Sequence, residues 1–95
     1  MAGRRREGLQ HIDAEVGRRI RKARLDRGMS QGELGQYLNV SFQQIQKYEN
    51  GFNSVALCRL PDLCGALGLS AASLVTGIDV KPAKSLKSPA KLPHK

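Results

Sequence analysis

One arrangement of polar and apolar positions occurs twice in the chain, with the second copy eleven residues after the first. The two copies read Met29-Ser30-Gln31-Gly32-Glu33-Leu34 and Val40-Ser41-Phe42-Gln43-Gln44-Ile45. In each copy a serine can cap a helix, a Glu or Gln three residues later can complete a capping box, and the flanking apolar residues can form a hydrophobic staple. The pattern predicts helices over Gln31–Leu38 and Phe42–Asn50. Between them Asn39 tolerates the left-handed backbone of a tight turn, and Gly51 is suited to ending the second helix.

The second predicted helix has two chemically different sides. Residues three and four apart are neighbours on a helix, so Ile45, Tyr48 and Glu49 share one side. The opposite side carries Phe42, Gln43, Gln46, Lys47 and Asn50. Amide side chains can bond adenine and a lysine can bond guanine or phosphate, so this side is suited to reading DNA. Two short helices joined by a tight turn form a helix-turn-helix. The alternative is that the glutamines are ordinary polar surface, although such a surface usually mixes carboxylates with its bases.

A longer helix is predicted ahead of this pair, over Asp13–Arg27. Asp13 is suited to be its N-cap, and the apolar positions that follow, including Ile20, keep a helical period. Arg24 falls one turn after Ile20, on the side expected to face the core. Glu49 lies on the inward side of the later helix and needs a partner if it is buried. We therefore expect Arg24 and Glu49 to form an ion pair that joins the two helices.

Two further helices are predicted toward the C-terminus, which makes the chain all-α with five helices. Apolar residues share one face of residues 56–67, where Pro61 must lie in the first turn or kink the helix, so the regular helix is expected to begin near Cys58. A third serine cap precedes a short helix over residues 71–76. Gly35, inside the first motif helix, costs about 1 kcal/mol relative to alanine, which indicates the close approach of another helix.

The composition adds a strong positive charge to this pattern. The chain has 95 residues, and 16 Lys and Arg against 8 Asp and Glu give a formal net charge of +8. This balance favours a polyanionic partner, either nucleic acid or an anionic membrane surface. Residues 13–77 are expected to form one domain between a flexible basic arm, residues 1–12, and a disordered Lys- and Pro-rich tail, residues 78–95. The arm could be a solvated end, or it could follow a DNA backbone or enter the minor groove. The tail could add nonspecific DNA affinity or only solubilise the chain.

Other chemistries find little support in the residues. Cys58 and Cys64 lack metal-ligand spacing, and a disulfide within one helix is geometrically poor, so both are expected to be small, buried or half-buried apolar residues. Paired carboxylates, an activated nucleophile and a phosphate-binding glycine loop are lacking, so no enzyme, no cofactor and no metal site is expected. No run of about 18 apolar residues and no secretion signal occur, so the expected location is the cytoplasm.

Residues 16–77 resemble the Cro and phage-repressor type of helix-turn-helix domain, the xenobiotic-response-element family. The likeness rests on Arg24, Ser30-Gln31-x-x-Leu34, Ser41 followed by Ile45, Tyr48-Glu49-Asn50-Gly51, and Leu60 to Leu74. The resemblance implies a compact five-helix domain that binds operator DNA, usually as a dimer. Carried over by position, Gln31 and Asn50 would contact phosphate, and Gln43 and Lys47 would read bases. Phe42 departs from the amide that phage repressors place there and could contact a thymine methyl group instead.

Residue pattern and resemblance together predict a sequence-specific, DNA-binding transcriptional regulator. The expected readers of bases in the major groove are Phe42, Gln43, Gln46 and Lys47. The expected contacts to phosphate are Gln31, Ser41, Asn50 and Asn53. The partners would be double-stranded DNA and a second copy of the chain, with a dimer that could be weak off DNA and no small-molecule effector evident. The alternative is a protein-interaction module of the same fold, such as an antitoxin or an adaptor to the transcription machinery.

Overall fold

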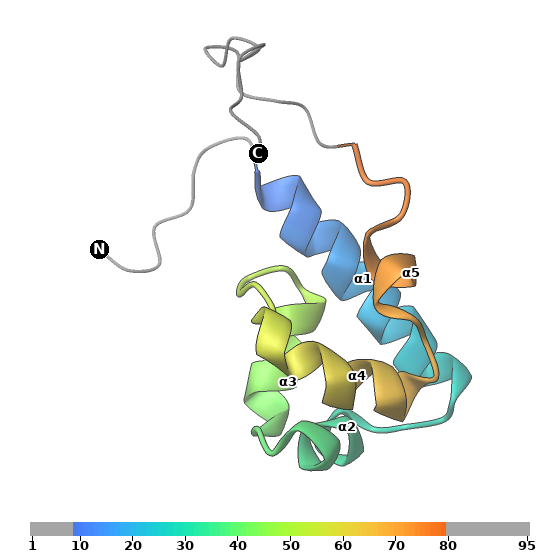
Figure 1. The fold of residues 1–95 in the computed structure, drawn as a ribbon. Coiled ribbons are helices and arrows are strands. Elements are labelled where there is room, and N and C mark those ends of the chain that lie inside the picture. The colour runs from blue at the N-terminus through green and yellow to red at the C-terminus, as the bar shows by residue number, and fades with distance from the viewer. Residues whose placement is uncertain (1–8, 80–95) are drawn as a thin grey trace, which may run out of the picture.

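The computed structural model describes residues 9–79, which form five α-helices and one short 3₁₀ turn (Figure 1). The elements are α1 (Gln10–Asp26), α2 (Gln31–Leu38), α3 (Phe42–Glu49), η1 (Leu57–Arg59), α4 (Leu60–Leu67) and α5 (Ala71–Val75). The described residues contain no strand, so the predicted all-α class with five helices is confirmed. Most of the predicted arm and tail, residues 1–8 and 80–95, lies outside the described residues. None of the described helices is both long and apolar enough to cross a membrane.

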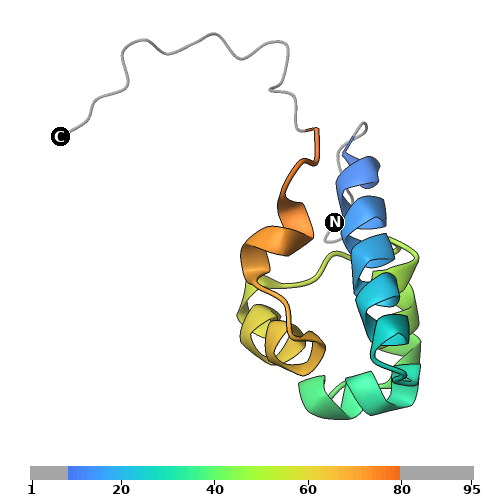
Figure 2. The ribbon, with the colours of Figure 1, turned by 90° about the vertical axis from the view of Figure 1, so that its right-hand side faces the viewer.

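All five helices contribute to one aliphatic core. The long helix α1 packs against α3 and α5, while α2 packs against α3 and α4 (Figures 1 and 2). The buried apolar residues are Ile20, Leu34, Leu38, Ile45, Tyr48, Leu63, Leu67 and Leu74. Burying one such side chain contributes about 1.5–3 kcal/mol, so the helices are held mainly by this shared core.

Serine caps start α2 and α3 where the sequence predicts them. At α2 the capping box is complete, because the Glu33 amide donates to Ser30 Oγ at 3.0 Å and the Ser30 amide donates to Glu33 Oε1 at 2.8 Å. At α3 the Gln44 amide donates to Ser41 Oγ at 3.2 Å. The Gln44 side chain turns instead to Asn53, donating to its Oδ1 at 3.4 Å. The second capping box is therefore only half formed, because the Gln44 side chain that would complete it bonds to Asn53 in the loop after α3.

The first helix begins earlier than predicted. It starts at Gln10 rather than after Asp13, so the expected N-cap role of Asp13 is wrong. The true N-cap, Leu9, makes no side-chain hydrogen bond to the helix. Asp13 lies in the first turn and accepts a hydrogen bond of 2.6 Å from Ser54 Oγ in the loop after α3. Its carboxylate still suits a helix start, because the N-terminal end of a helix carries partial positive charge.

Pro61 lies in the first turn of α4, as predicted, but the regular helix begins at Leu60 rather than near Cys58. The residues ahead of it, including Cys58, form the separate 3₁₀ turn η1. Proline is accommodated there because the first amides of a helix have no partner within it. Cys64 is half-buried against the core, and burial raises the pKa of its thiol. Cys58 is exposed, so the expectation of burial holds for Cys64 and is wrong for Cys58.

Candidate nucleic-acid interface

The turn between α2 and α3 is tight and depends on two special backbone positions. Asn39 adopts the left-handed conformation, with φ 59° and ψ 44°. A Cβ added to Gly35 would stand 2.6 Å from the Val40 carbonyl oxygen. The close approach predicted at Gly35 is therefore present, but its neighbour is the backbone of the turn and not another helix. These two positions set α3 at a defined angle to α2.

Helix α3 turns one side to the core and leaves the other in solvent. Ile45, Tyr48 and Glu49 are buried. The five residues of the opposite side, Phe42, Gln43, Gln46, Lys47 and Asn50, are all exposed. The division into two sides agrees with the sequence pattern. The helix itself ends at Glu49, one residue earlier than predicted, with Asn50 as its C-cap and Gly51 beyond it at φ +78°.

A buried ion pair joins α3 to α1. Arg24 Nε donates to Glu49 Oε2 at 2.6 Å and Arg24 Nη2 donates to Glu49 Oε1 at 3.0 Å. Only 8% of the arginine side chain and 4% of the glutamate side chain are exposed. Arg24 Nη1 also donates to the Met29 carbonyl oxygen at 2.7 Å, which fixes the connection between α1 and α2. The pair expected from the sequence is thus present, and it holds the inward side of α3 in place.

Gln31, the first residue of α2, extends this network. Its Nε2 donates to Glu49 Oε1 at 3.0 Å, so the amide expected at a phosphate is also bound inside the protein. An amide nitrogen carries two hydrogens, and one of them is therefore used by Glu49. The backbone N–H of a first helical residue has no partner within its own helix. Gln31 thus keeps donors for an outside group while it is held in position by Glu49.

The loop after α3 is shaped by its own asparagines. Asn50 Oδ1 accepts a hydrogen bond of 2.9 Å from the Phe52 amide. Asn53 Oδ1 accepts a hydrogen bond from the Gln44 side chain. The backbone N–H of Asn53 donates to the Lys47 carbonyl oxygen at 3.1 Å. In both asparagines the carbonyl oxygen is used and the NH₂ group has no partner among residues 9–79. Both side chains therefore keep their two N–H donors for an outside group.

Gly17 makes a close contact with α3 that the sequence pattern did not predict. A Cβ at Gly17 would overlap the Tyr48 carbonyl oxygen and stand 2.6 Å from that of Glu49. The backbone of α1 therefore touches the C-terminal end of α3 directly. The available signal was a glycine in the middle of a strongly predicted helix, where it costs about 1 kcal/mol unless something needs the space.

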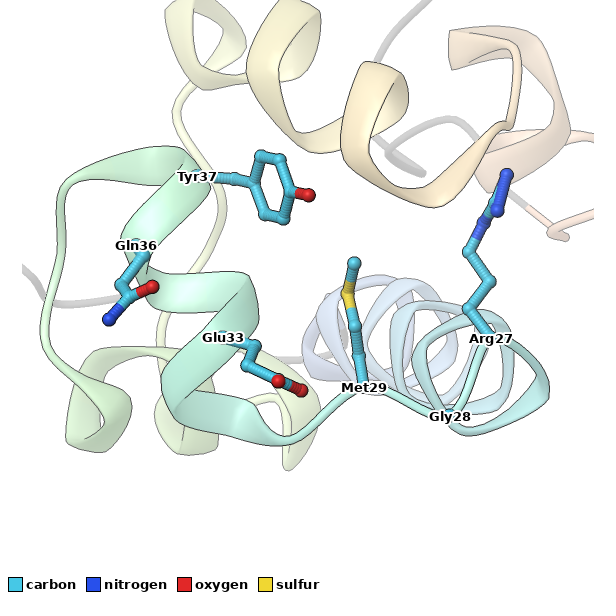
Figure 3. A pocket seen from close by; sticks show the side chains of 6 residues that line it. All are labelled: Arg27, Gly28, Met29, Glu33, Gln36 and Tyr37. Atoms are coloured by element: carbon cyan, nitrogen blue, oxygen red, sulfur yellow. The ribbon is translucent and has the colours of Figure 1, made fainter.

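A separate pocket of about 520 Å³ lies on the other side of α2 (Figure 3). Its lining residues are Arg27, Gly28, Met29, Glu33, Gln36 and Tyr37. Met29 and Tyr37 point into it from the α1–α2 connection and from α2. It includes no residue of α3, so it is distinct from the exposed amide-rich side.

Comparison with known proteins places this arrangement in a family. A model of the helix-turn-helix family matches residues 20–74, which include α2, the turn and α3. An uncharacterized transcriptional regulator in the ATPase CF(0) region of Rhodospirillum rubrum is 44% identical over 61 residues, covering 64% of this chain and 56% of that protein. The uncharacterized HTH-type transcriptional regulator y4aM of Sinorhizobium fredii is 50% identical over 56 residues, covering 59% of this chain and 39% of that protein.

A solved structure shows the same fold. The clp gene regulator ClgR of Corynebacterium glutamicum superposes with a TM-score of 0.64 at 30% identity, covering 67% of this chain and 82% of that one. The curated relatives are longer, since the match spans about half or less of their length. The matched family model covers more than half of this chain, from the second part of α1 to the penultimate residue of α5. The chain therefore belongs to the helix-turn-helix family.

Proposed function

We propose that this protein is a sequence-specific, DNA-binding transcriptional regulator that places α3 in the major groove. The observation that carries the proposal is the division of α3, whose amide- and lysine-bearing side is exposed while its other side is held by the core and the Arg24–Glu49 pair. A helix about 10–12 Å across fits a major groove about 12 Å wide. The protein would act by occupying a promoter or by recruiting other proteins to it, without chemistry of its own.

The proposed readers of bases are the exposed residues of α3. Gln43 and Gln46 can each form two hydrogen bonds to adenine, and Lys47 can donate to guanine. Phe42 is 50% exposed at the start of the helix, where its ring could contact a thymine methyl group. Because the backbone of α3 is already ordered, binding costs only the rotamer freedom of these side chains, which favours recognition of a defined sequence.

The proposed phosphate contacts surround α3 and share one property. Gln31, Asn50 and Asn53 each keep N–H donors after their internal hydrogen bonds are counted. Ser41 accepts a hydrogen bond from Gln44, which leaves its hydroxyl hydrogen for an outside acceptor. Phosphate oxygens accept such donors, and contacts of this kind set the register of a protein on the duplex. The basic segments before and after the helical body would add further backbone contacts.

A dimer on a two-fold operator is the proposed binding form. Two half-sites would then lie about 34 Å apart, one turn of the duplex. Exposed apolar side chains near the C-terminal helices support a contact between copies, since Leu57 is 81% exposed and Val75 is 56% exposed. The dimer would be weak off DNA if these small patches alone form it.

Selection from a randomised duplex library, at stated salt, tests the function. The expected result is one enriched motif, with two half-sites if the protein binds as a dimer. The same selection with Gln43→Ala and Lys47→Ala together should lose the motif, while Gln36→Ala, on the outer side of α2, should keep it. Failure to enrich any motif, together with tight binding to a protein partner, would instead favour the protein-interaction module.

A further inference from the structure

Almost every arginine in the described part of the chain is bound within the protein. Five of the six arginines in residues 9–79 donate to an internal partner. The pairs are Arg18 and Arg19 with Glu15, Arg24 with Glu49, Arg27 with the Leu67 carbonyl oxygen, and Arg59 with the Leu38 carbonyl oxygen. Arg21 is the exception, since it has no ion pair or hydrogen bond of its side chain to any residue from 9 to 79. An exposed guanidinium without an internal partner can bind an outside anion without first breaking a contact.

The position of Arg21 along α1 follows from two close contacts between α1 and the end of α3. A Cβ on Gly51 would stand 2.7 Å from Ala14 Cα, and Gly17 touches the carbonyl groups of residues 48 and 49. The two helices cross obliquely, with opposite overall sense in Figure 1, and they touch at the C-terminal end of α3. Arg21 follows Gly17 by one turn of α1, and Arg24, two turns after Gly17, reaches Glu49 with its side chain. Arg21 therefore lies on the part of α1 that runs beside the C-terminal end of α3.

The direction of Arg21 follows from its neighbours on α1. Positions 17, 21 and 24 lie on one strip of a helix, since they are four and three residues apart. Gly17 and Arg24 are buried against α3, whereas Arg21 is exposed. Its side chain therefore leaves α1 at the edge of the contact with α3.

We infer that Arg21 binds a backbone phosphate at the edge of the groove that α3 occupies, an inference that rests on the proposed function. A helix that fills the major groove has a phosphate strand along each flank, because helix and groove have similar widths. Arg21 lies at one flank of α3, beside the C-terminal end of that helix. A guanidinium can hold a phosphate with two parallel hydrogen bonds, which a lysine cannot do. Arg21 would thus position α3 against the strand without reading sequence itself.

The dependence of DNA affinity on salt tests this role. Loss of one phosphate contact lowers the slope of log affinity against log salt by about 0.9, and weakens binding about three- to tenfold for all duplexes alike. Arg21→Gln should show both effects with the selected operator and with an unrelated duplex. Arg21→Lys should keep most of the slope, because the charge remains.

Lys22→Gln is the matched control, since it removes the same charge from the adjacent residue. Lys22 is exposed and bonded to Asp26, and it lies five residues from Gly17, on a different side of α1. It should change the slope by much less. Circular dichroism and thermal melting would establish that the variants fold. An Arg21→Gln slope equal to that of the wild type, or to that of Lys22→Gln, overturns the inference while the proposed function stands. A wild-type protein that binds no duplex overturns both.

Discussion

Arg24 of α1 holds Glu49 of α3 through two hydrogen bonds, of 2.6 and 3.0 Å, in a site where both side chains are almost fully buried. This contact ties together elements that are far apart in the chain, and Gln31 joins it from α2. Because Glu49 is fixed on the inward side of α3, the residues on the opposite side must face solvent. The pair therefore sets the orientation of the helix that we propose to read DNA.

Removing one member of this pair should destabilise the fold strongly. Glu49→Gln leaves the buried Arg24 charge without its counter-ion, and the expected cost is about 3–5 kcal/mol in the free energy of unfolding. Urea denaturation followed by circular dichroism measures it. Glu15→Gln removes a carboxylate that bonds Arg18 and Arg19 at the surface of α1, and it should change stability by much less. A Glu49→Gln cost no larger than that of Glu15→Gln would show that the pair is not needed to hold α3.

The direct backbone contact at Gly17 leads to a second prediction. Gly17→Ala adds a methyl group where the carbonyl oxygens of Tyr48 and Glu49 lie, so α1 and α3 must separate. The loss should exceed the gain of about 1 kcal/mol that alanine brings to a helix, so the variant should be less stable than the wild type. Gly65→Ala is the matched control, because a Cβ at Gly65, within α4, meets nothing within 4 Å. It should stabilise by about 0.5–1 kcal/mol. Equal effects of the two substitutions would rule out the close contact.

Features set by neighbours in the chain could be predicted from the sequence. The limits of α2 follow from a capping box that spans Ser30 and Glu33, and the turn follows from the tolerance of Asn39 for positive φ. The pairing of Arg24 with Glu49 could also be predicted, because a buried charge needs a partner and the helical periods placed both residues inward.

Contacts between distant residues could not be predicted in the same way. Asp13 looks like an N-cap by its local sequence, but its partner is Ser54, which lies 41 residues later. Gln44 matches a capping box, but Asn53 competes for its side chain. The closeness of Gly17 to α3 depends on how the two helices cross, which no local pattern encodes. The same limit applies to Arg21, because its lack of a partner among residues 9–79 can be seen only in the folded structure.

Specificity should depend on the exposed glutamines of α3. Gln43→Ala is expected to relax the preference at one base pair by about 1–3 kcal/mol, because it would remove the proposed bidentate contact to adenine. Affinity for an unrelated duplex should be nearly unchanged, since phosphate contacts dominate nonspecific binding. Competitive binding to a library of single-base operator variants measures the preference at each position. Gln36→Ala, an exposed glutamine on α2 outside the proposed interface, should leave the preference unaltered. A Gln43→Ala protein with the wild-type preference at every position would remove Gln43 from the set of base readers.

The basic residues after Asp79 should add affinity without adding specificity. Residues 80–95 carry five lysines, at positions 81, 84, 87, 91 and 95, and no acidic residue. A chain that ends at Asp79 should bind operator and unrelated duplexes more weakly by the same factor, because lysines release counter-ions from any duplex. Its slope of log affinity against log salt should fall by about 0.9 for each lysine that contacts a phosphate. A full-length chain with the five lysines changed to glutamine separates charge from length and should match the truncated chain. Truncation that leaves the slope unchanged would limit the DNA-binding surface to the helical body and the segment before it.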